Sequence, residues 1–266
     1  MNFHYLNAVR EHQPLIHNIA NLVSAHFTAN GLLALGATPM MAQSPAEMAE
    51  LAAISGALVL NLGTPSDEKV AAMLVAGVAA NRANVPVVLD PVAVAASTLR
   101  RETVAQFREN IAFSAIRGNA GEMAHLAGMV WQSKGVDAGS GESDVAQIAQ
   151  TVSQKWQCVA VVSGAVDYVS DGVRVARLVN GVDFFARVTA SGCLLSAVVG
   201  AFLAVAPREQ AFEAVCEACT VYAVAGELAA KNLQNHQVGT FAWRLLDTLA
   251  GITSEQVQHM AKISML

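Results

Sequence analysis

The sequence lacks the features that mark membrane, secreted and nucleic-acid-binding proteins. No apolar run is long enough to span a bilayer: the segment Ala190 to Ala206 contains Ser and Gly and stops at Pro207. The N-terminus has no basic segment followed by an apolar stretch, so no secretory signal is predicted. Basic residues are scattered, and Arg100-Arg101 is the only adjacent pair in the sequence. We therefore expect no nucleic-acid partner. We expect a cytoplasmic protein with no membrane partner.

Several catalytic motifs are also missing. There is no Walker A sequence and no GxGxxG, which argues against P-loop NTPases and dinucleotide-binding enzymes. There is no HExxH, and His17 and His26 are not at zinc-ligand spacing. Ser163 lacks the Gly two residues earlier that a nucleophile elbow needs. Of four cysteines, only Cys216 and Cys219 have metal-like spacing, and without a second pair we interpret them as reduced core residues.

The 266 residues are 54% apolar and 14% charged, which indicates a large core or a buried subunit interface. No linker or repeat is visible, so we expect one domain over residues 1–266. Apolar β-branched runs predict strands at Ala57–Asn61, Val85–Leu89, Ser114–Ile116, Val159–Ser163, Tyr168–Ser170 and Val173–Leu178. Helical patterns alternate with them at Asp67–Ala83, Glu102–Asn110, Ala120–Ala127, Val145–Lys155, Cys193–Val205 and Gln210–Asn232. The order predicts an α/β fold with a mostly parallel sheet covered on both faces.

Shorter signals refine this outline. Asp171-Gly172 predicts a hairpin turn and an antiparallel edge of the sheet. Ser44-Pro45-Ala46-Glu47 predicts a helix start with Pro in the first turn and Glu at the capping-box position. Ser66-Asp67-Glu68 predicts a second helix start with acidic residues in its first turn. The Gly/Ser-rich tract Lys134–Ser143 is interpreted as a surface loop.

Ligands of such sheets bind beyond the carboxyl ends of the strands, where this sequence places its polar residues. The candidates are Asp90-Pro91, Arg117 to Glu122, Ser163 to Asp167, and the turn Thr189–Cys193. Asp90 and Glu122 could hold Mg²⁺, which uses one or two carboxylates and takes phosphate oxygens for the rest. Arg117 could pair with a polyphosphate through two parallel donors. The structural alternatives are a turn cap for Asp90, a solvated helical turn for Glu122 and a surface ion pair for Arg117.

The turn before the apolar segment Leu194 to Val205 is the most informative stretch. Its small residues predict a helix start capped by Ser191. The first turn of a helix has unpaired N–H groups and partial positive charge, so it suits an anion. We expect the same position to lower the pKa of the Cys193 thiol. The alternative is a structural cap followed by a buried cysteine.

Several longer motifs resemble those of a known family, and together they cover nearly the whole chain. They are Pro14–Asn21, Phe27–Ala37, Leu60–Thr64, Leu89–Val92, Ile116–Asn119, Lys134–Asp137 and the turn before Cys193. Their order and length resemble the hydroxyethylthiazole kinase family of the ribokinase-like group. The resemblance implies a three-layer fold and transfer of the ATP γ-phosphoryl group to the primary alcohol of 4-methyl-5-(2-hydroxyethyl)thiazole, in thiamine biosynthesis and salvage. It also implies a homotrimer with active sites between subunits.

The resemblance assigns roles to individual residues. It implies substrate contacts from Met41, Asn21 and the backbone of Ala190, ATP contacts from Arg117, Ser163 and Asn119, Mg²⁺ contacts from Asp90 and Glu122, and catalytic roles for Ser191, Gly192 and Cys193. Cys193 would lie where related sugar kinases place their Asp base. The amides of residues 191–193 would receive the negative charge as it moves.

Three positions depart from the family pattern. Ala190 stands where the family usually has Gly, and its Cβ penalises positive φ, so the turn must use ordinary φ there or be strained. Ser163 replaces a Thr and keeps the hydroxyl, and Gly121 stands where Ser is frequent. The alternatives left open are a kinase for a pyrimidine- or pyridoxal-type alcohol, an ATP-dependent dehydratase of the same group, and a catalytically silent thiazole- or nucleotide-binding protein.

Overall fold

The computed structural model describes residues 3–131 and 142–266. The predicted surface loop Lys134–Ser143 and the motif Lys134–Asp137 therefore lie outside the described residues, apart from Glu142 and Ser143. Those two residues begin a helix rather than end a loop, because α7 spans Glu142–Trp156. No helix in the described ranges is long and apolar enough to cross a membrane.

A single nine-stranded sheet, in the order β2-β1-β3-β4-β5-β6-β7-β8-β9, forms the centre of the described structure. Its strands are β1 (Leu15–Ile19), β2 (Thr38–Met40), β3 (Ala57–Asn61), β4 (Val87–Asp90), β5 (Ala115–Asn119), β6 (Val159–Ser163), β7 (Asp167–Ser170), β8 (Val175–Leu178) and β9 (Ile263–Met265). The pairs from β2 to β6 are parallel, and β6 through β9 pair antiparallel. The predicted parallel sheet and the Asp171-Gly172 hairpin between β7 and β8 are confirmed.

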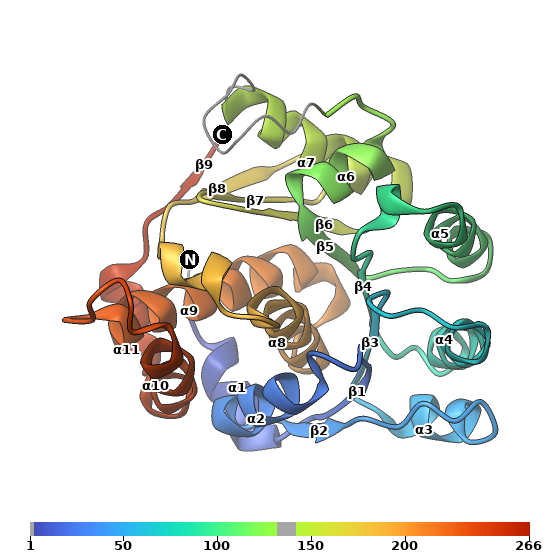
Figure 1. Ribbon diagram of the computed structural model, residues 1–266, viewed down its shortest axis with the longest axis horizontal. Coiled ribbons are helices and arrows are strands. Elements are labelled where there is room, and N and C mark those ends of the chain that lie inside the picture. The colour runs from blue at the N-terminus through green and yellow to red at the C-terminus, as the bar shows by residue number, and fades with distance from the viewer. Residues whose placement is uncertain (1–2, 132–141) are drawn as a thin grey trace.

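Helices cover both faces of the sheet, which makes three layers (Figure 1). One face carries α1 (Tyr5–His12), α2 (Ala25–Leu35), α8 (Ser191–Val205), α9 (Ala211–Ala230), α10 (Val238–Gly251) and α11 (Ser254–Met260). The other face carries α3 (Met48–Ile54), α4 (Asp67–Arg82), α5 (Thr98–Asn110), α6 (Ala120–Ala127) and α7.

The apolar residues of the central strands divide between two cores because successive side chains of a strand point to opposite faces. In β3, Val59 joins the core beneath α8 and α9, whereas Leu58 and Leu60 join the core beneath α4. All five residues of β3 are buried, as expected for a strand of a parallel sheet covered on both sides. The high apolar content of the sequence is therefore accounted for by two cores and by the nearly all-apolar helix α8.

The structure confirms some predicted helix starts and contradicts others. The Ser66 side chain accepts a hydrogen bond from the Lys69 amide, so Ser66 caps α4 as predicted. The start predicted at Ser44–Glu47 is wrong, because residues 45–47 form a turn and α3 begins at Met48 without a side-chain cap. Cys216 and Cys219 are buried free thiols in α9, in agreement with the interpretation as core residues.

Candidate active site

The strand register brings the predicted polar residues to one edge of the sheet. Asn61 at the end of β3 lies opposite Asp90 at the end of β4, and Asn119 at the end of β5 lies opposite Ser163 at the end of β6. Parallel strands end at a common edge, so residues far apart in the sequence become neighbours there. Helix α8 begins above the same edge, since Ser196 in its second turn donates a hydrogen bond to Asp90.

Asp90 is a buried carboxylate with one oxygen fully engaged and one free. Its side chain is 1% exposed, and Oδ2 accepts hydrogen bonds from Asn61 Nδ2 at 2.7 Å and Ser196 Oγ at 2.9 Å. Oδ1 is buried and has no hydrogen-bond partner among the described residues. Burial raises the pKa of Asp90 to about 6, and the nearby Arg117 guanidinium opposes this shift. The free oxygen is the atom available to a ligand.

Arg117 joins three of the predicted site residues. Its Nη2 donates to Ser163 Oγ at 2.5 Å, and its Nη1 lies 4.0 Å from Asp90 Oδ2. A Cβ added at Gly192 would lie only 2.6 Å from the same Nη1, so the guanidinium lies against the start of α8. The structure therefore brings Asp90, Arg117, Ser163 and Gly192 into one site, rather than leaving Arg117 in a surface ion pair.

The first turn of α8 differs from the prediction. The N-cap residue is Ala190, with φ of 72° in the left-handed region, and the expected cap by Ser191 is wrong. The Ser191 hydroxyl donates to Phe185 O at 2.7 Å, and its amide donates to Val188 O at 3.3 Å. Ser191 is therefore held by the scaffold, and its amide is not available to an anion. The amides of Gly192 and Cys193 have no backbone partner within the described residues.

The strained turn at Ala190 allows a direct test. A left-handed conformation costs a non-glycine residue about 1–2 kcal/mol, whereas glycine adopts it freely. Part of that gain is offset because glycine adds entropy to the unfolded chain. We expect Ala190→Gly to raise the free energy of unfolding by about 0.5–1 kcal/mol in urea denaturation. A decrease would show that the turn does not hold this conformation in solution.

Cys193 does not have the lowered pKa that the helix start predicts. Burial raises the pKa of its thiol, and the negative charge of Asp90 adds to this effect. Hydrogen bonds from neighbours such as Asn21, whose Nδ2 lies 3.5 Å from Sγ, oppose the shift without reversing it. The expectation failed because burial and a neighbouring carboxylate outweigh the partial charge of a helix terminus. The thiol is protonated at neutral pH.

Glu122 and Asn119 form the start of α6. Glu122 Oε2 accepts from the Asn119 amide at 2.8 Å, and Asn119 Oδ1 accepts from the Glu122 amide at 2.9 Å, which is a capping box. Glu122 Oε1 also accepts from the Ala93 amide at 2.8 Å. Glu122 thus fixes the loop that follows Asp90, and only the remaining lone pairs of its oxygens are free for a ligand.

The predicted acceptor side lies over β1 and β2. Asn21 follows β1, is nearly buried, and donates from Nδ2 to Asn61 Oδ1 at 2.8 Å. Met41 directly follows β2, which pairs with β1, and its side chain is half-buried. Both residues therefore lie at the carboxyl edge of the sheet, on the opposite side of Asp90 from Ser163.

The structure adds three polar residues that the sequence reasoning missed. Lys69 is 7% exposed and donates from Nζ to Gly63 O at 2.9 Å; burial, with help from Arg100, lowers its pKa to about 8. Arg100 donates to the carbonyls of Leu62 and Val92 and so ties the loops after β3 and β4 together. The third residue is Asn61, which lies within the motif Leu60–Thr64 but was not predicted to be a site residue. Nothing in the sequence predicted a buried role for Lys69, because Lys69 lies in a polar first helical turn of the kind that is usually exposed to solvent.

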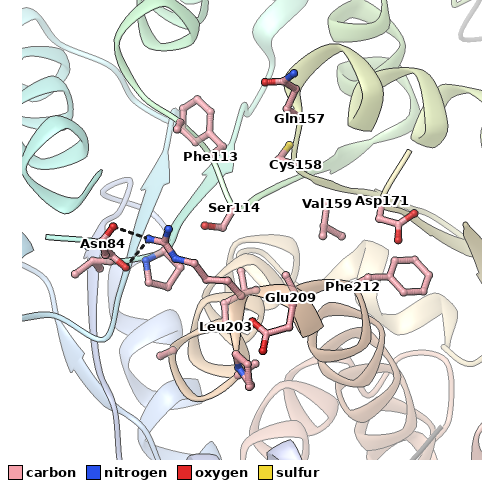
Figure 2. Close-up of a pocket in the computed structure, with 18 of the residues that line it drawn as sticks. Asn84, Phe113, Ser114, Gln157, Cys158, Val159, Asp171, Leu203, Glu209 and Phe212 are labelled. Carbon is pink, nitrogen blue, oxygen red and sulfur yellow. Dashed lines mark hydrogen bonds between the residues drawn. The ribbon is translucent and has the colours of Figure 1, made fainter. Parts of the chain in front are cut away.

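A cavity of about 680 Å³ lies elsewhere, at the opposite edge of the sheet (Figure 2). It is lined by residues that precede or begin strands, such as Ser114 before β5 and Val159 at the start of β6. Arg208 at its wall donates to Asn84 O at 2.9 Å. None of the predicted site residues lines this cavity. The predicted site residues therefore lie at the other edge of the sheet from this cavity.

The residues at that edge fit a magnesium ion better than zinc. In the described ranges, no group of three or more His, Cys, Asp or Glu side chains could hold a metal by itself. Mg²⁺ needs only one or two carboxylates when phosphate oxygens supply further ligands. The unpartnered Oδ1 of Asp90 could serve as such a ligand, and Glu122 is close enough to raise the pKa of Asp90.

Comparisons with known proteins show which family the chain belongs to. The model of the hydroxyethylthiazole kinase family matches residues 6–255. A hydroxyethylthiazole kinase of Glaesserella parasuis is 69% identical over 258 residues, covering 97% of this chain and 96% of the relative. The structure of a hydroxyethylthiazole kinase protein from Pyrococcus horikoshii OT3 has a TM-score of 0.90 at 33% identity, covering 99% of this chain and 98% of that one.

More distant structures share the architecture alone. A pyridoxal kinase from Staphylococcus aureus superposes with a TM-score of 0.63 at 14% identity, covering 95% of this chain and 97% of that chain. This likeness confirms the predicted ribokinase-like α/β fold. The family match over most of the sequence, and the high identity to full-length relatives, decide the assignment: the chain belongs to the hydroxyethylthiazole kinase family.

Proposed function

We propose that the chain transfers the γ-phosphoryl group of ATP to the primary alcohol of 4-methyl-5-(2-hydroxyethyl)thiazole at the edge formed by β3 to β6 and α8. The observation that supports this most is the position of Arg117, which bonds Ser163, approaches Asp90 and lies against Gly192. A guanidinium placed between a strand-end hydroxyl and the free amides of a helix start is suited to hold a transferring phosphoryl group.

The roles of the residues follow from the loose transition state of phosphoryl transfer, in which positioning and charge neutralisation supply most of the rate. Arg117 and Ser163 would hold the polyphosphate, with Asn119 beside them. The amides of Gly192 and Cys193 would receive the negative charge as it moves. Mg²⁺, when bound, would be held by Asp90 through Oδ1, with Glu122 nearby, and would neutralise phosphate charge. Asn21, Met41 and the backbone at Ala190 would hold the thiazole alcohol.

Cys193 would pack beside the attacking alcohol without acting as a strong base. Its raised pKa leaves the thiol protonated at neutral pH, and a loose transition state releases the alcohol proton only late. We expect Cys193→Ala to lower kcat by about 10²-fold or less, and Cys193→Asp to retain activity. Steady-state kinetics at saturating ATP measure both. If kcat fell by much more than 10²-fold in a folded Cys193→Ala enzyme, Cys193 would be the catalytic base after all.

The activity itself is tested by coupled detection of ADP with a panel of alcohols. We expect ADP formation with hydroxyethylthiazole to exceed that with pyridoxal and hydroxymethylpyrimidine, and to require Mg²⁺. ADP formation only with another alcohol would replace the substrate assignment. Binding of the thiazole without ADP formation would indicate a silent binding protein, and ADP formation with a dehydrated product would indicate a dehydratase.

We further propose a homotrimer with active sites between subunits. Leu22 and Val23, directly after Asn21, are 79% and 64% exposed, although they border the acceptor side. Apolar side chains this exposed beside a site are typical of a surface covered by a partner. We expect sedimentation velocity to give the mass of three 27.8 kDa chains, and Leu22→Glu combined with Val23→Glu to shift it toward the monomer. A wild-type monomer would contradict the proposal.

A further inference from the structure

We propose that Asn61 is a positioning residue that holds the Asp90 carboxylate by Oδ2, leaves Oδ1 free for a cation, and links Asp90 to the acceptor side. Asn61 is the last residue of β3 and is 3% exposed. It contacts Asn21 on one side and Asp90 on the other, with hydrogen bonds of 2.8 Å and 2.7 Å. The inference deepens the proposed phosphoryl transfer and rests on it for the catalytic readout.

The orientation of the Asn61 amide is fixed by a donor that cannot change its role. The backbone N–H of Gly63 donates to Asn61 Oδ1 at 3.0 Å, so the atom facing it must be the oxygen. Asn21 Nδ2 donates to the same oxygen. The NH₂ group of Asn61 must therefore face Asp90, and a flipped amide would set its NH₂ against these two donors.

Asp90 is held in turn by two donors on one oxygen. Asn61 Nδ2 and Ser196 Oγ both bond Oδ2, one from the sheet and one from α8. With Oδ2 engaged, the buried Oδ1 remains without a partner among the described residues, and it is the atom that can meet a cation. Loss of the Asn61 bond would let the carboxyl group rotate, since Ser196 alone does not define its plane.

The catalytic test is a double-mutant cycle between Asn61→Leu and Asp90→Asn. Leucine keeps the branching of the asparagine side chain at Cγ and has no hydrogen-bonding group. We expect Asn61→Leu to lower kcat by about 10-fold to 10²-fold, because small misplacements of a reacting centre have effects of that size. In the Asp90→Asn background the same substitution is expected to change kcat less than about 3-fold, since interacting residues are not additive. If the loss of kcat in the double mutant equalled the product of the losses in the two single mutants, Asn61 would not act through Asp90.

A binding measurement keeps the inference testable whatever the alcohol substrate is. Calorimetric titration of Mn²⁺ into the full-length protein with saturating ADP reports the metal site without turnover. We expect Asn61→Leu to weaken Mn²⁺ binding by about 10-fold, as loss of a partner of a metal ligand does. If wild type fails to phosphorylate hydroxyethylthiazole, the proposed function fails while this result still stands. Unchanged Mn²⁺ affinity in Asn61→Leu would overturn the inference.

Asn18→Leu is the matched control. Asn18 is a buried amide on the neighbouring strand β1, and its Nδ2 donates to Ile16 O at 3.0 Å and to no other group that the structure describes. We expect it to lose stability like Asn61→Leu but to bind Mn²⁺ like wild type. Should Asn61→Leu fail to fold, Asn61→Ser, which keeps a small polar group, serves in both measurements. Equal weakening by Asn18→Leu would assign the effect to general destabilisation and reject the positioning role.

Discussion

Asp90→Asn is expected to abolish most of the activity while making the folded protein more stable at alkaline pH. The substitution keeps the shape of the side chain and removes the negative charge that would hold a cation. Removing one preorganised electrostatic contact from a transition state typically lowers kcat by about 10²–10³-fold. Because the unpartnered oxygen of buried Asp90 would meet the cation under the proposed function, we expect the upper end of that range.

The stability effect has a definite sign. Burial raises the pKa of Asp90 to about 6, above its ordinary value near 3.8, so the folded state binds the proton more tightly than the unfolded chain. The contribution of Asp90 to the free energy of unfolding is therefore largest below pH 4, and it is lost as the pH rises through 6. Asparagine avoids that loss, which is on the order of 3 kcal/mol at pH 8.

Urea denaturation at pH 4 and pH 8, at a fixed protein concentration, measures this difference. Asp90→Asn is expected to be more stable than wild type at pH 8 and about equal to it at pH 4. Asp247→Asn, an exposed substitution on α10, is the control and is expected to change neither value. If Asp90→Asn were less stable at pH 8, Asp90 would be paired more strongly than its contacts indicate.

Gly192→Ala is expected to weaken ATP binding while leaving the fold intact. The added Cβ would lie 2.6 Å from Arg117 Nη1 and 2.9 Å from Nη2, closer than real Cβ contacts allow. These atoms end a flexible side chain, so the guanidinium moves away and the helix start stays in place. Loss of a charged hydrogen bond corresponds to about 1.5–3 kcal/mol, so we expect KM for ATP to rise by roughly 10-fold to 10²-fold.

Gly239→Ala is a closely matched control for this prediction. Gly239 is the second residue of α10 as Gly192 is the second residue of α8, and a Cβ there would have nothing within 4 Å. We expect it to leave KM for ATP unchanged and to preserve stability. An unchanged KM for ATP in Gly192→Ala would mean that Arg117 does not contact the nucleotide from its place over α8.

The sequence predicted two strands of the sheet with correct bounds. The runs at Ala57–Asn61 and Val159–Ser163 are nearly continuous apolar stretches, as expected of strands covered on both faces. Strand β1 was missed although it has five residues, because His17 and Asn18 interrupt its apolar run. Strands β2 and β9 were missed because each has three residues, which is too few for a two-residue period to show. Helices α1, α2, α10 and α11 were also missed, although α1 and α10 are amphipathic.

The sequence predicted that several polar residues gather at one edge of the sheet, but it did not predict their electrostatics. The spacing of Asp90, Arg117 and Ser163 after successive strands indicated a shared edge, and the register confirms it. The expected low pKa of Cys193 was wrong, because burial and proximity to Asp90 are properties of the packed structure. The sequence left two possibilities for Ala190, an ordinary φ or a strained positive φ. In the structure Ala190 has the positive φ.

A crystal structure of the protein with a non-hydrolysable ATP analogue, Mg²⁺ and hydroxyethylthiazole tests the proposed site most directly. We expect the γ-phosphate to lie within hydrogen-bonding distance of Arg117 and of the amides of Gly192 and Cys193, with Mg²⁺ beside Asp90 Oδ1. A triphosphate bound at the opposite edge of the sheet, in the cavity beside Arg208, would contradict the proposed site.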